Sequence, residues 1–594
     1  MKILGIIKNN IMKNLYQFRT NLKKLWQYLS KRRQKQFKLI LGLMILASFM
    51  EVISIGAVLP FLGILTAPEY VFNHELMLPL IKVLGLTAPE QIIFPVTVIF
   101  IITTVAATSI RLLLLYGMTR LSFAAGADMS INIFRKTLHQ EYSVHLTRNS
   151  SEVINGVITK TGEVIGGVFS PILTLISATF LMIGIMSALI TIDTKIALSA
   201  FSGFGILYLG VLKLTHKQVH KNGKCVAEES TNMIKVLQEG LGGIRDILID
   251  GSQEYYCKLY RHADLAFRRA TGNNVFISGS PRYAMEAIGM ILIAILAYYM
   301  LQQKSGGLTV IPVLGALAIG AQKLLPALQQ SYNAINGIKG STYILNDVLD
   351  LLDQPLPDYA TESVPEPIAF QKEINLKNIC FKYNNNAPWI INNLNLNIKK
   401  GSRVGFIGET GAGKSTLLDI IMGLLEPSNG NILIDDIPLT RANYRSWQVR
   451  IAHVPQNIFL TDGTIEENIA FGIKSNMIDH DRVVRAAQQA KISEMVESSD
   501  DKYNTFVGER GIRLSGGQRQ RIGIARALYK QASVLIFDEA TNALDNETEK
   551  AVLESIEDLG KDLTILIIAH RLSTLKDCSQ IVELSKDGVK HWNQ

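Results

Sequence analysis

Long apolar runs fill the first part of the chain. Six of them are long enough to cross about 30 Å of hydrocarbon as helices. They lie at 39–65, 92–116, 166–190, 196–214, 275–301 and 308–335. The first run has 27 residues, more than the roughly 7–15 apolar residues of a signal peptide, so we expect it to remain as a membrane helix. The pattern predicts an α-helical transmembrane domain with six spans.

Lysine and arginine are distributed unevenly between these runs. They are frequent between the second and third runs and after the fourth, whereas the segments after the first, third and fifth runs contain only Lys82, Lys195 and Lys304. Cytoplasmic loops of membrane proteins carry the excess of positive charge. We therefore expect a multi-pass protein of the cytoplasmic (inner) membrane, with both termini and both long connections in the cytoplasm.

The two long connections, 117–165 and 215–274, show helical periodicity with interspersed charge. They are predicted to be helices that continue past the bilayer. Each is expected to turn at an irregular segment, at 142–151 and 251–256, against which a soluble domain could press. Solvated loops are the alternative.

Composition limits the class of protein. A mean hydropathy of +0.20 with 48% hydrophobic residues excludes a disordered chain. The four cysteines are too far apart for a disulfide framework or a metal site. The pI is about 9.1, and the first forty residues contain eleven Lys and Arg and no acid. A basic segment directly before an apolar run favours anionic lipid, and not nucleic acid, as its partner.

Several ionisable residues fall within or at the ends of the spans. They are Glu51, Arg111, Arg282, Glu286 and Lys323. Such residues are costly in hydrocarbon and usually face a cavity or a charged partner. Two interpretations stay open: an interhelical Glu–Arg pair that only fixes packing, or cations that face a substrate. The short segment 75–85 is too brief to span and is predicted to lie in the outer interface as an amphipathic helix.

The composition changes after Leu352. Four prolines at 355, 357, 365 and 367 are typical of a linker. We expect a basic N-terminal segment at 1–38, the membrane domain at 39–345, a linker at 346–365 and a soluble domain at 366–594.

The soluble domain contains a phosphate-binding motif. An apolar strand at 404–407 is followed by a glycine-rich loop and a helix, in the G-x-x-x-x-G-K-S pattern. The nucleotide-binding candidates are Gly408, Glu409, Thr410, Gly411, Ala412, Gly413, Lys414, Ser415 and Thr416. Glycines let backbone N–H groups approach phosphates, and the following helix N-terminus favours an anion. Lys414 can neutralise β/γ-phosphate charge, and Ser415 can bind Mg²⁺.

A second apolar strand, 534–538, ends in two carboxylates. Asp538 is expected to bind Mg²⁺, and Glu539 to act as the general base for the attacking water. The sequence thus predicts an α/β P-loop ATPase that uses ATP and Mg²⁺.

Between these motifs lies Leu514-Ser-Gly-Gly-Gln518, and here the chain resembles the ATP-binding cassette family. The resemblance covers 366–594 closely and implies roles in family order: Tyr383 stacks adenine, Gln456 contacts the metal and the water, Asp545 forms the D-loop and His570 the switch. The membrane half resembles a type IV, exporter-type transmembrane domain. Asn542 stands where related exporters usually have serine.

The resemblance also implies a dimer. Ser515, Gly516, Gly517 and Gln518 present N–H groups and a hydroxyl at a helix start, without a phosphate partner in their own domain. They are expected to close over the γ-phosphate bound by an opposite subunit, which implies a homodimer; a heterodimer stays possible. The implied activity is ATP hydrolysis coupled to export. A gated channel or regulator is the rival from another class, against which an intact Glu539 and His570 argue.

Substrate identity rests on a finer resemblance. Ser48-Phe-Met-Glu51, Leu59-Pro-Phe61 and Pro281-Arg282-Tyr with Glu286 resemble the bacterial lipid-linked oligosaccharide flippases. The implied substrate is a polyprenyl-pyrophosphate glycan, and Arg111, Arg282 and Lys323 could hold its pyrophosphate. The alternative is an exporter of phospholipid, lipid A or hydrophobic drugs.

Overall fold

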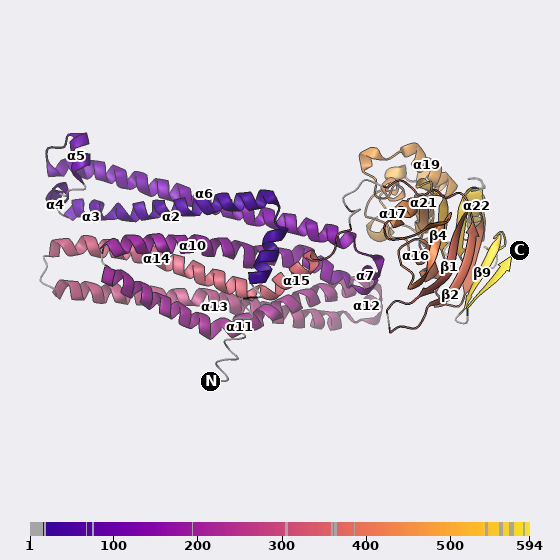
Figure 1. The fold of residues 1–594 in the computed structure, drawn as a ribbon, viewed down its shortest axis with the longest axis horizontal. Helices are drawn as coiled ribbons and strands as arrows, with labels where there is room; N and C mark the ends of the chain where they lie inside the picture. Colours follow the sequence, from indigo (N-terminus) through magenta and orange to yellow (C-terminus); the bar gives the residue numbers. More distant parts are fainter. Residues whose placement is uncertain are drawn as a thin grey trace. The chain divides into compact units, whose positions relative to one another are not determined.

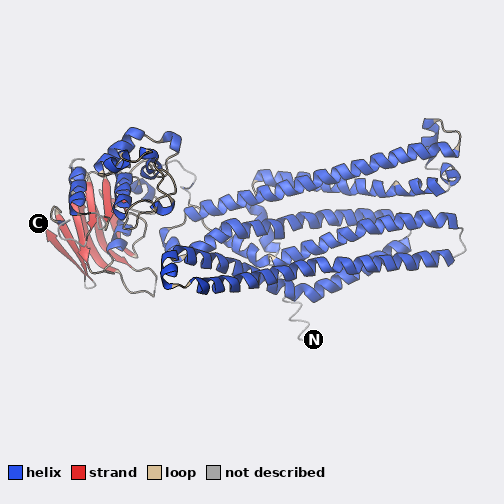
Figure 2. Ribbon diagram, turned by 180° about the vertical axis from the view of Figure 1, so that it is seen from behind, coloured by secondary structure: helices blue, strands red, loops and turns tan. Residues whose placement is uncertain are grey.

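The computed structural model describes most of the chain. The described residues are 16, 19–66, 68–73, 77–192, 194–302, 307–357, 360, 365–384, 386–540, 545–557, 562–569, 575–585 and 588–593. The chain forms two compact units. The helical unit comprises Met1–Gln140 and Arg148–Leu356, and the α/β unit comprises Glu141–Thr147 and Pro357–Gln594. The strands that the structure describes all lie in the α/β unit (Figure 2).

The helical unit consists of long helices that pack side by side (Figure 1). Its elements are α2 Lys31–Gly56, α3 Val58–Thr66, α4 Pro68–Phe72, α5 Leu78–Leu84, η2 Pro89–Ile92, α6 Ile93–Leu138, α8 Ser150–Asn155, η3 Gly156–Lys160, α9 Thr161–Val164, η4 Ile165–Phe169, α10 Ser170–Ile192, α11 Thr194–Gly242, α12 Ile244–Asp250, α13 Gln253–Gln302, α14 Gly307–Gly340 and α15 Thr342–Leu352.

Every predicted span is helical, and the first, 39–65, is divided between α2 and α3. Within the described residues, three helical stretches are long and apolar enough to cross a membrane: Lys31–Leu65, Pro89–Leu138 and Ser150–Ile190. The other three predicted spans lie on α11, α13 and α14, whose apolar parts include side chains outside the description. The predicted helical extensions are present as well, because α6, α11 and α13 each continue far beyond their apolar run.

Glycine allows two pairs of these helices to approach closely. A Cβ on Gly223 of α11 would stand 2.0 Å from the backbone oxygen of Gly340 at the end of α14. A Cβ on Gly126 of α6 would stand 1.8 Å from Cδ1 of Ile165. Because neither gap has room for another carbon atom, the absence of a side chain sets the helix spacing.

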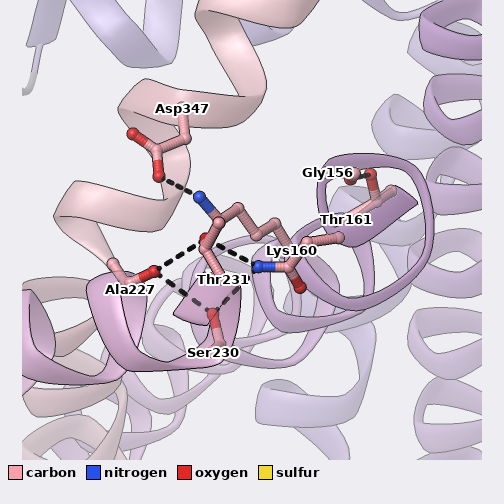
Figure 3. Close-up of polar contacts among 8 residues, drawn as sticks. Gly156, Lys160, Thr161, Ala227, Ser230, Thr231 and Asp347 are labelled. Atoms are coloured by element: carbon pink, nitrogen blue, oxygen red, sulfur yellow. Dashed lines mark hydrogen bonds and ion pairs between the residues drawn. The ribbon is translucent and has the colours of Figure 1, made fainter. Parts of the chain in front are cut away.

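Two sets of polar contacts join four elements, α8, η3, α11 and α15, in the stretch of chain before α10 (Figure 3). Lys160, at the end of the π-helical turn η3, donates from Nζ to Oδ2 of Asp347 on α15 at 2.6 Å. The fully buried Asn155 donates to Oγ of Ser230 at 3.1 Å and to Oγ1 of Thr231 at 2.9 Å, both on α11. The turns η3 and η4 are π-helical and interrupt the regular α-helical hydrogen bonding before α10. Such π turns often occur at functional positions.

The predicted turns are more regular than the sequence indicates. Residues 142–147 form the short helix α7 and not an irregular loop. In the second connection, Gly251 ends α12 with a left-handed φ of 64°, and α13 already begins at Gln253. A left-handed glycine cap stops a helix in one residue, so the turn is shorter than 251–256. Solvated loops are thereby excluded for both segments.

The range predicted as a linker is partly helical. Residues 346–352 belong to α15, which packs in the helical unit. The basic N-terminal segment contributes a helix at 19–28, and its Lys24 Nζ and Tyr28 Oη both lie 2.5 Å from the carboxylate of Asp353. Burial, with the bond to Asp353, raises the pKa of Tyr28 to about 12. Leu25 and Leu29 are buried, so this segment is also part of the core.

Within the segment predicted as an interfacial helix, 75–85, residues Leu78–Leu84 form the helix α5, and residues 75 and 76 lie outside the described residues. Ile81 of α5 is buried with Ile64, Val71 and Ile92, whereas Val83 is 83% exposed. The residues of this helix therefore separate into a packed and an open side. Its placement in the outer interface stays a prediction.

The α/β unit contains two sheets. A mixed sheet has the order β10-β9-β3-β8-β7-β6, in which every pair except β10–β9 is parallel, and an antiparallel sheet has the order β2-β1-β4-β5. The strands are β1 Glu373–Phe381, β2 Ile391–Lys399, β3 Arg403–Gly408, β4 Asn429–Ile434, β5 Ile437–Pro438, β6 Ile451–Val454, β7 Val534–Asp538, β8 Thr564–Ile568, β9 Gln580–Ser585 and β10 Gly588–Asn593.

The longer helices of this unit pack into two separate cores, whereas α7 and η6 (Ser475–Met477) bury no residue. The helices of the unit are α7 Tyr142–Thr147, α16 Lys414–Ile421, α17 Tyr444–Gln448, α18 Ile465–Ile469, η6 Ser475–Met477, α19 His480–Gln489, α20 Ser493–Glu497, η7 Lys502–Asn504, η8 Glu509–Gly511, α21 Gly516–Tyr529 and α22 Asn546–Glu557. Side chains of α16 are buried between the two sheets. Those of α18, α19, α20 and α21 form the other core, against the opposite face of the mixed sheet.

Candidate nucleotide-binding and hydrolysis site

The glycine-rich loop connects β3 to α16. Gly408, Gly411 and Gly413 have φ angles of 146°, 85° and 88°, which L side chains rarely adopt. A Cβ on Gly408 would stand 2.3 Å from the oxygen of Leu584, and one on Gly413 would stand 2.9 Å from Cγ2 of Ile390. The loop therefore needs glycine for its backbone and for space. Its shape directs N–H groups toward a bound anion at the start of α16.

Two polar side chains follow this loop at the start of α16. Nζ of Lys414 donates to the carbonyl oxygens of Gly408 and Glu409, at 2.7 and 3.0 Å. Oγ of Ser415 donates to Oδ1 of Asp538 at 3.3 Å. The lysine is thus held over the loop, and the serine faces the carboxylate at the end of β7.

Asp538 and Ser415 fit a magnesium ion. Both provide oxygen, which Mg²⁺ prefers, and burial raises the pKa of Asp538. A half-buried carboxylate with a raised pKa gains from a nearby cation. These two residues would hold Mg²⁺, and the ion would supply positive charge that offsets the charge of the ATP phosphates.

The carboxylate of Glu539 lies beside Gln456. Nε2 of Gln456 donates to Oε2 of Glu539 at 2.7 Å. Glu539 has a left-handed φ of 51°, and its N–H donates to the oxygen of Ile568 on β8 at 3.1 Å. Such a backbone is costly for a residue other than glycine and is common at active sites. The side chain thereby lies beside Gln456, two residues after the end of β6.

Tyr383 provides an aromatic face near the loop. Its ring packs edge-to-face on Phe381 at 5.0 Å between centroids, and its hydroxyl lies 3.0 Å from Oγ1 of Thr416. The residue is 51% exposed, so one face stays open for stacking. The geometry suits an adenine ring whose phosphates lie on the loop.

The signature segment caps α21. Oγ of Ser515 accepts from the N–H of Gln518 at 3.2 Å, and Oε1 of Gln518 accepts from the N–H of Ser515 at 2.8 Å. This reciprocal capping box fixes the helix start and leaves the N–H groups of Gly516 and Gly517 for another acceptor. Because α21 packs in a different core from α16, the two anion-binding helix starts belong to separate parts of the unit.

The remaining nucleotide residues are placed in part. The carboxylate of Asp545 accepts from N and Oγ1 of Thr548, at 2.9 and 2.7 Å. These bonds lower the pKa of Asp545 and place it at the start of α22. His570 and Asn542 lie outside the described residues.

Asp419 is a charged neighbour of the site that sequence reasoning missed. Burial and the charge of Asp538 raise its pKa from 3.8 to about 6. It lies on α16, one helical turn after Ser415. The spacing from Ser415 could have indicated a shared helix face, but only the tertiary structure brings Asp538 near it.

The structure describes the side chains of two of the three predicted substrate cations. Nε of Arg282 donates to Oε1 of Glu286 at 2.7 Å, four residues later on the same helix α13, so this is not the interhelical pair that the sequence left open. Arg111 is exposed on α6. The side chain of Lys323 lies outside the described residues. A pyrophosphate site made by these three cations therefore stays a prediction.

Two family models match this chain. The ABC transporter model matches residues 391–542, and the ABC transporter transmembrane region model matches residues 80–318. Together they cover the phosphate-binding loop, the signature and most of the long helices.

Curated relatives extend over most of the chain. It is 27% identical over 502 residues to an ATP-dependent lipid A-core flippase of Alkalilimnicola ehrlichii, which covers 82% of this chain and 83% of that protein. It is 29% identical over 459 residues to the protein of the same name in Saccharophagus degradans, with 77% and 76% covered.

A solved structure shares the fold. A bacterial Atm1-family ABC exporter with ATP bound superposes with a TM-score of 0.75 at 22% identity, with 95% of each chain covered. The family models, the relatives and this fold agree with the strand, loop and helix geometry described above. The chain therefore belongs to the ABC transporter family, as a multi-pass membrane exporter in which a helical transmembrane region precedes a C-terminal ATPase domain that couples ATP hydrolysis to transport.

Proposed function

We propose that this chain forms a homodimer that uses ATP to move an amphipathic lipid with a charged, saccharide-bearing head group out of the cytoplasmic leaflet. The relatives named as lipid A-core flippases favour a lipid A-type phosphoglycolipid. The observation that carries the ATP-driven part is the pair of contacts at the ends of β6 and β7: Gln456 to Glu539 at 2.7 Å and Ser415 to Asp538 at 3.3 Å.

These contacts define the hydrolytic step. Glu539 accepts a proton from a water molecule while the oxygen of that water attacks the γ-phosphorus. The bond between the γ-phosphorus and the bridging oxygen of the β-phosphate breaks, which releases ADP and phosphate. Gln456 holds the carboxylate in place. Lys414 leaves its loop carbonyls to offset the charge of the phosphates. His570 is proposed as the switch residue on the family resemblance alone.

The dimer follows from the open signature. Ser515 and Gln518 satisfy each other, so the N–H groups of the two following glycines need an external acceptor. The γ-phosphate held by a second copy meets that requirement. One cassette per chain then gives two equivalent sites, each completed by the signature of the partner. Asp545, at the start of α22, is proposed to lie along this interface.

Transmission to the membrane helices is proposed to run through α7. This helix belongs to the α/β unit, although it connects α6 to α8 along the chain. Within that unit, Arg441 contacts Glu141, just before α7, at 2.6 Å and Glu426 at 2.7 Å. When two α/β units close on ATP, the covalent continuity at both ends of α7 moves α6 and α8. Hydrolysis then resets the exporter.

The choice of substrate is the less supported part. Arg282 is paired with Glu286 within its own helix, and the relatives favour the lipid A-type alternative over a polyprenyl-pyrophosphate glycan. If Arg282 only fixes packing, Arg282→Ala should leave substrate-stimulated turnover unchanged in a folded exporter. Loss of stimulation in that variant would return the residue to the substrate path.

The test is transport by the purified protein in vesicles. We expect ATPase activity to rise with a lipid A-type phosphoglycolipid, and the labelled lipid to cross the bilayer only with ATP. Glu539→Gln serves as the matched blank. Stimulation by polyprenyl-pyrophosphate oligosaccharide alone would refute the lipid A-type substrate, and indifference to both lipids would refute lipid export.

A further inference from the structure

The α/β unit has a cavity at the amino ends of β7 and β8, whereas the nucleotide site lies at the carboxyl end of β7. It has a volume of about 490 Å³ and is lined by alanine and leucine side chains together with polar side chains from four segments. Those used here are Lys400, Arg482, Arg485, Gln489, Ser533 and Asp562. Ser533 and Asp562 stand just before β7 and β8, whereas Asp538 and Glu539 stand at the far end of β7. Five residues of strand separate the two places, which is roughly 16 Å.

The charges around this cavity do not balance. Lys400, Arg482 and Arg485 contribute three cations, and Asp562 contributes one carboxylate. Nζ of Lys400 lies 3.5 Å from Oδ1 of Asp562, but the Asp562 side chain is 95% exposed, so water screens this pair strongly. Among the described residues, neither Arg482 nor Arg485 forms an ion pair with an acid. The cavity thus has a surplus of about two positive charges.

The Arg482 side chain is held in place but has a hydrogen-bond donor without a partner in the part of the chain that the structure describes. Its guanidinium carbon lies 4.5 Å from the ring centroid of Tyr529, a cation–π contact that fixes the side chain. Its Nε is buried and has no hydrogen-bond partner among the described residues. A buried, unsatisfied donor on a charged group is costly. An acceptor that enters the cavity would remove that cost.

We propose that this cavity binds a small phosphate-bearing anion with at least two negative charges. Guanidinium groups match phosphate oxygens with paired N–H donors, and Arg482 and Arg485 lie one helical turn apart on α19. Lys400 adds a third positive charge from the turn between β2 and β3. Gln489 and Ser533 add neutral polar groups to the lining.

A ligand bound in this cavity would connect α19 to the amino ends of two inner strands, β3 and β7, of the mixed sheet. The arginines belong to α19, which packs on the signature helix α21. Lys400 and Ser533 belong to the segments that lead into β3 and β7. A bound anion would therefore contact both the helical part and the sheet of the same unit. This site is independent of the transported substrate.

The test is calorimetric titration of the full-length protein in nanodiscs with inorganic pyrophosphate. Divalent cations are removed with a chelating resin, and no ATP is added, because ATP is itself a multiply charged phosphate anion that would compete for the cavity. We expect saturable binding that weakens with added salt. Arg485→Gln should weaken it at least tenfold, and Arg482→Lys should weaken it because the planar fork is lost.

Two control variants make the result specific. Arg261→Gln removes the same charge from an exposed position on α13 and should leave pyrophosphate affinity unchanged. Lys414→Ala disables the glycine-rich loop and should leave it unchanged as well. The proposal is overturned if the wild type does not bind pyrophosphate, if folded Arg485→Gln binds it equally well, or if Lys414→Ala abolishes binding.

Discussion

The ion pair between Lys160 and Asp347 is unequal, and this inequality gives a sharp test of the packing beside η3. Nζ and Oδ2 are 2.6 Å apart, but the Lys160 side chain is 10% exposed and that of Asp347 is 42% exposed (Figure 3). Only the lysine has lost its water. Removing the carboxylate should therefore cost more than removing the ammonium group.

The expected magnitudes follow from this burial. Breaking a fully buried pair by removing one partner costs about 3–5 kcal/mol. Because water reaches Asp347, we expect Asp347→Ala to lower the unfolding free energy by about 2 kcal/mol. Lys160→Met keeps an apolar stem and leaves a hydrated carboxylate, so it should cost less than about 1 kcal/mol. The double variant should resemble Lys160→Met, since the stranded charge is then absent.

The assay is thermal or denaturant unfolding of the full chain in nanodiscs, with the four proteins compared as a double-mutant cycle. Asp264→Ala is the control, because its partner Arg268 is 71% exposed on the same helix, and such pairs contribute about 0.3–0.5 kcal/mol. Equal losses for Asp347→Ala and Lys160→Met, or strictly additive losses in the double variant, would refute the reasoning.

Three further predictions concern the nucleotide site and the helix packing. Glu539→Gln should keep ATP binding and lower the ATPase rate at least 100-fold, since general-base catalysis contributes about 10²–10⁴-fold; an unaltered rate in a phosphate-release assay would contradict its role. Asp419, whose folded pKa is about 6, binds its proton more tightly in the folded state, so without divalent cations stability should fall as pH rises from about 4 to 6. Asp419→Asn should remove that loss in melting curves, and a pH-independent difference from wild type would count against it. Gly223→Ala should lower the unfolding free energy by about 1–3 kcal/mol, because the new Cβ would stand 2.0 Å from the backbone oxygen of Gly340. Gly240→Ala is the control: its Cβ would stand 3.6 Å from Cδ1 of Tyr256, so it should be neutral or stabilising in the same unfolding assay.

Local patterns determined much of this protein. The glycine-rich loop and the carboxylates after β7 are readable because a strand, a tight loop and a helix start are encoded by neighbouring residues. The membrane helices are readable because hydrocarbon requires long apolar runs. The pair of Arg282 with Glu286 was also within reach, since residues four apart share a helix face.

The tertiary structure alone decided the contacts between distant segments. Gln456 meets Glu539 because β6 pairs in parallel with β7, and no local pattern specifies that strand order. The raised pKa of Asp419 requires Asp538 beside it. The range 346–365 is predicted to be a linker because prolines dominate its composition. Residues 346–352 are nevertheless helical, since Val348, Leu349 and Leu352 are buried against other helices. Burial and charge proximity are properties of the packed chain, so the sequence indicated the chemistry and packing determined which groups meet.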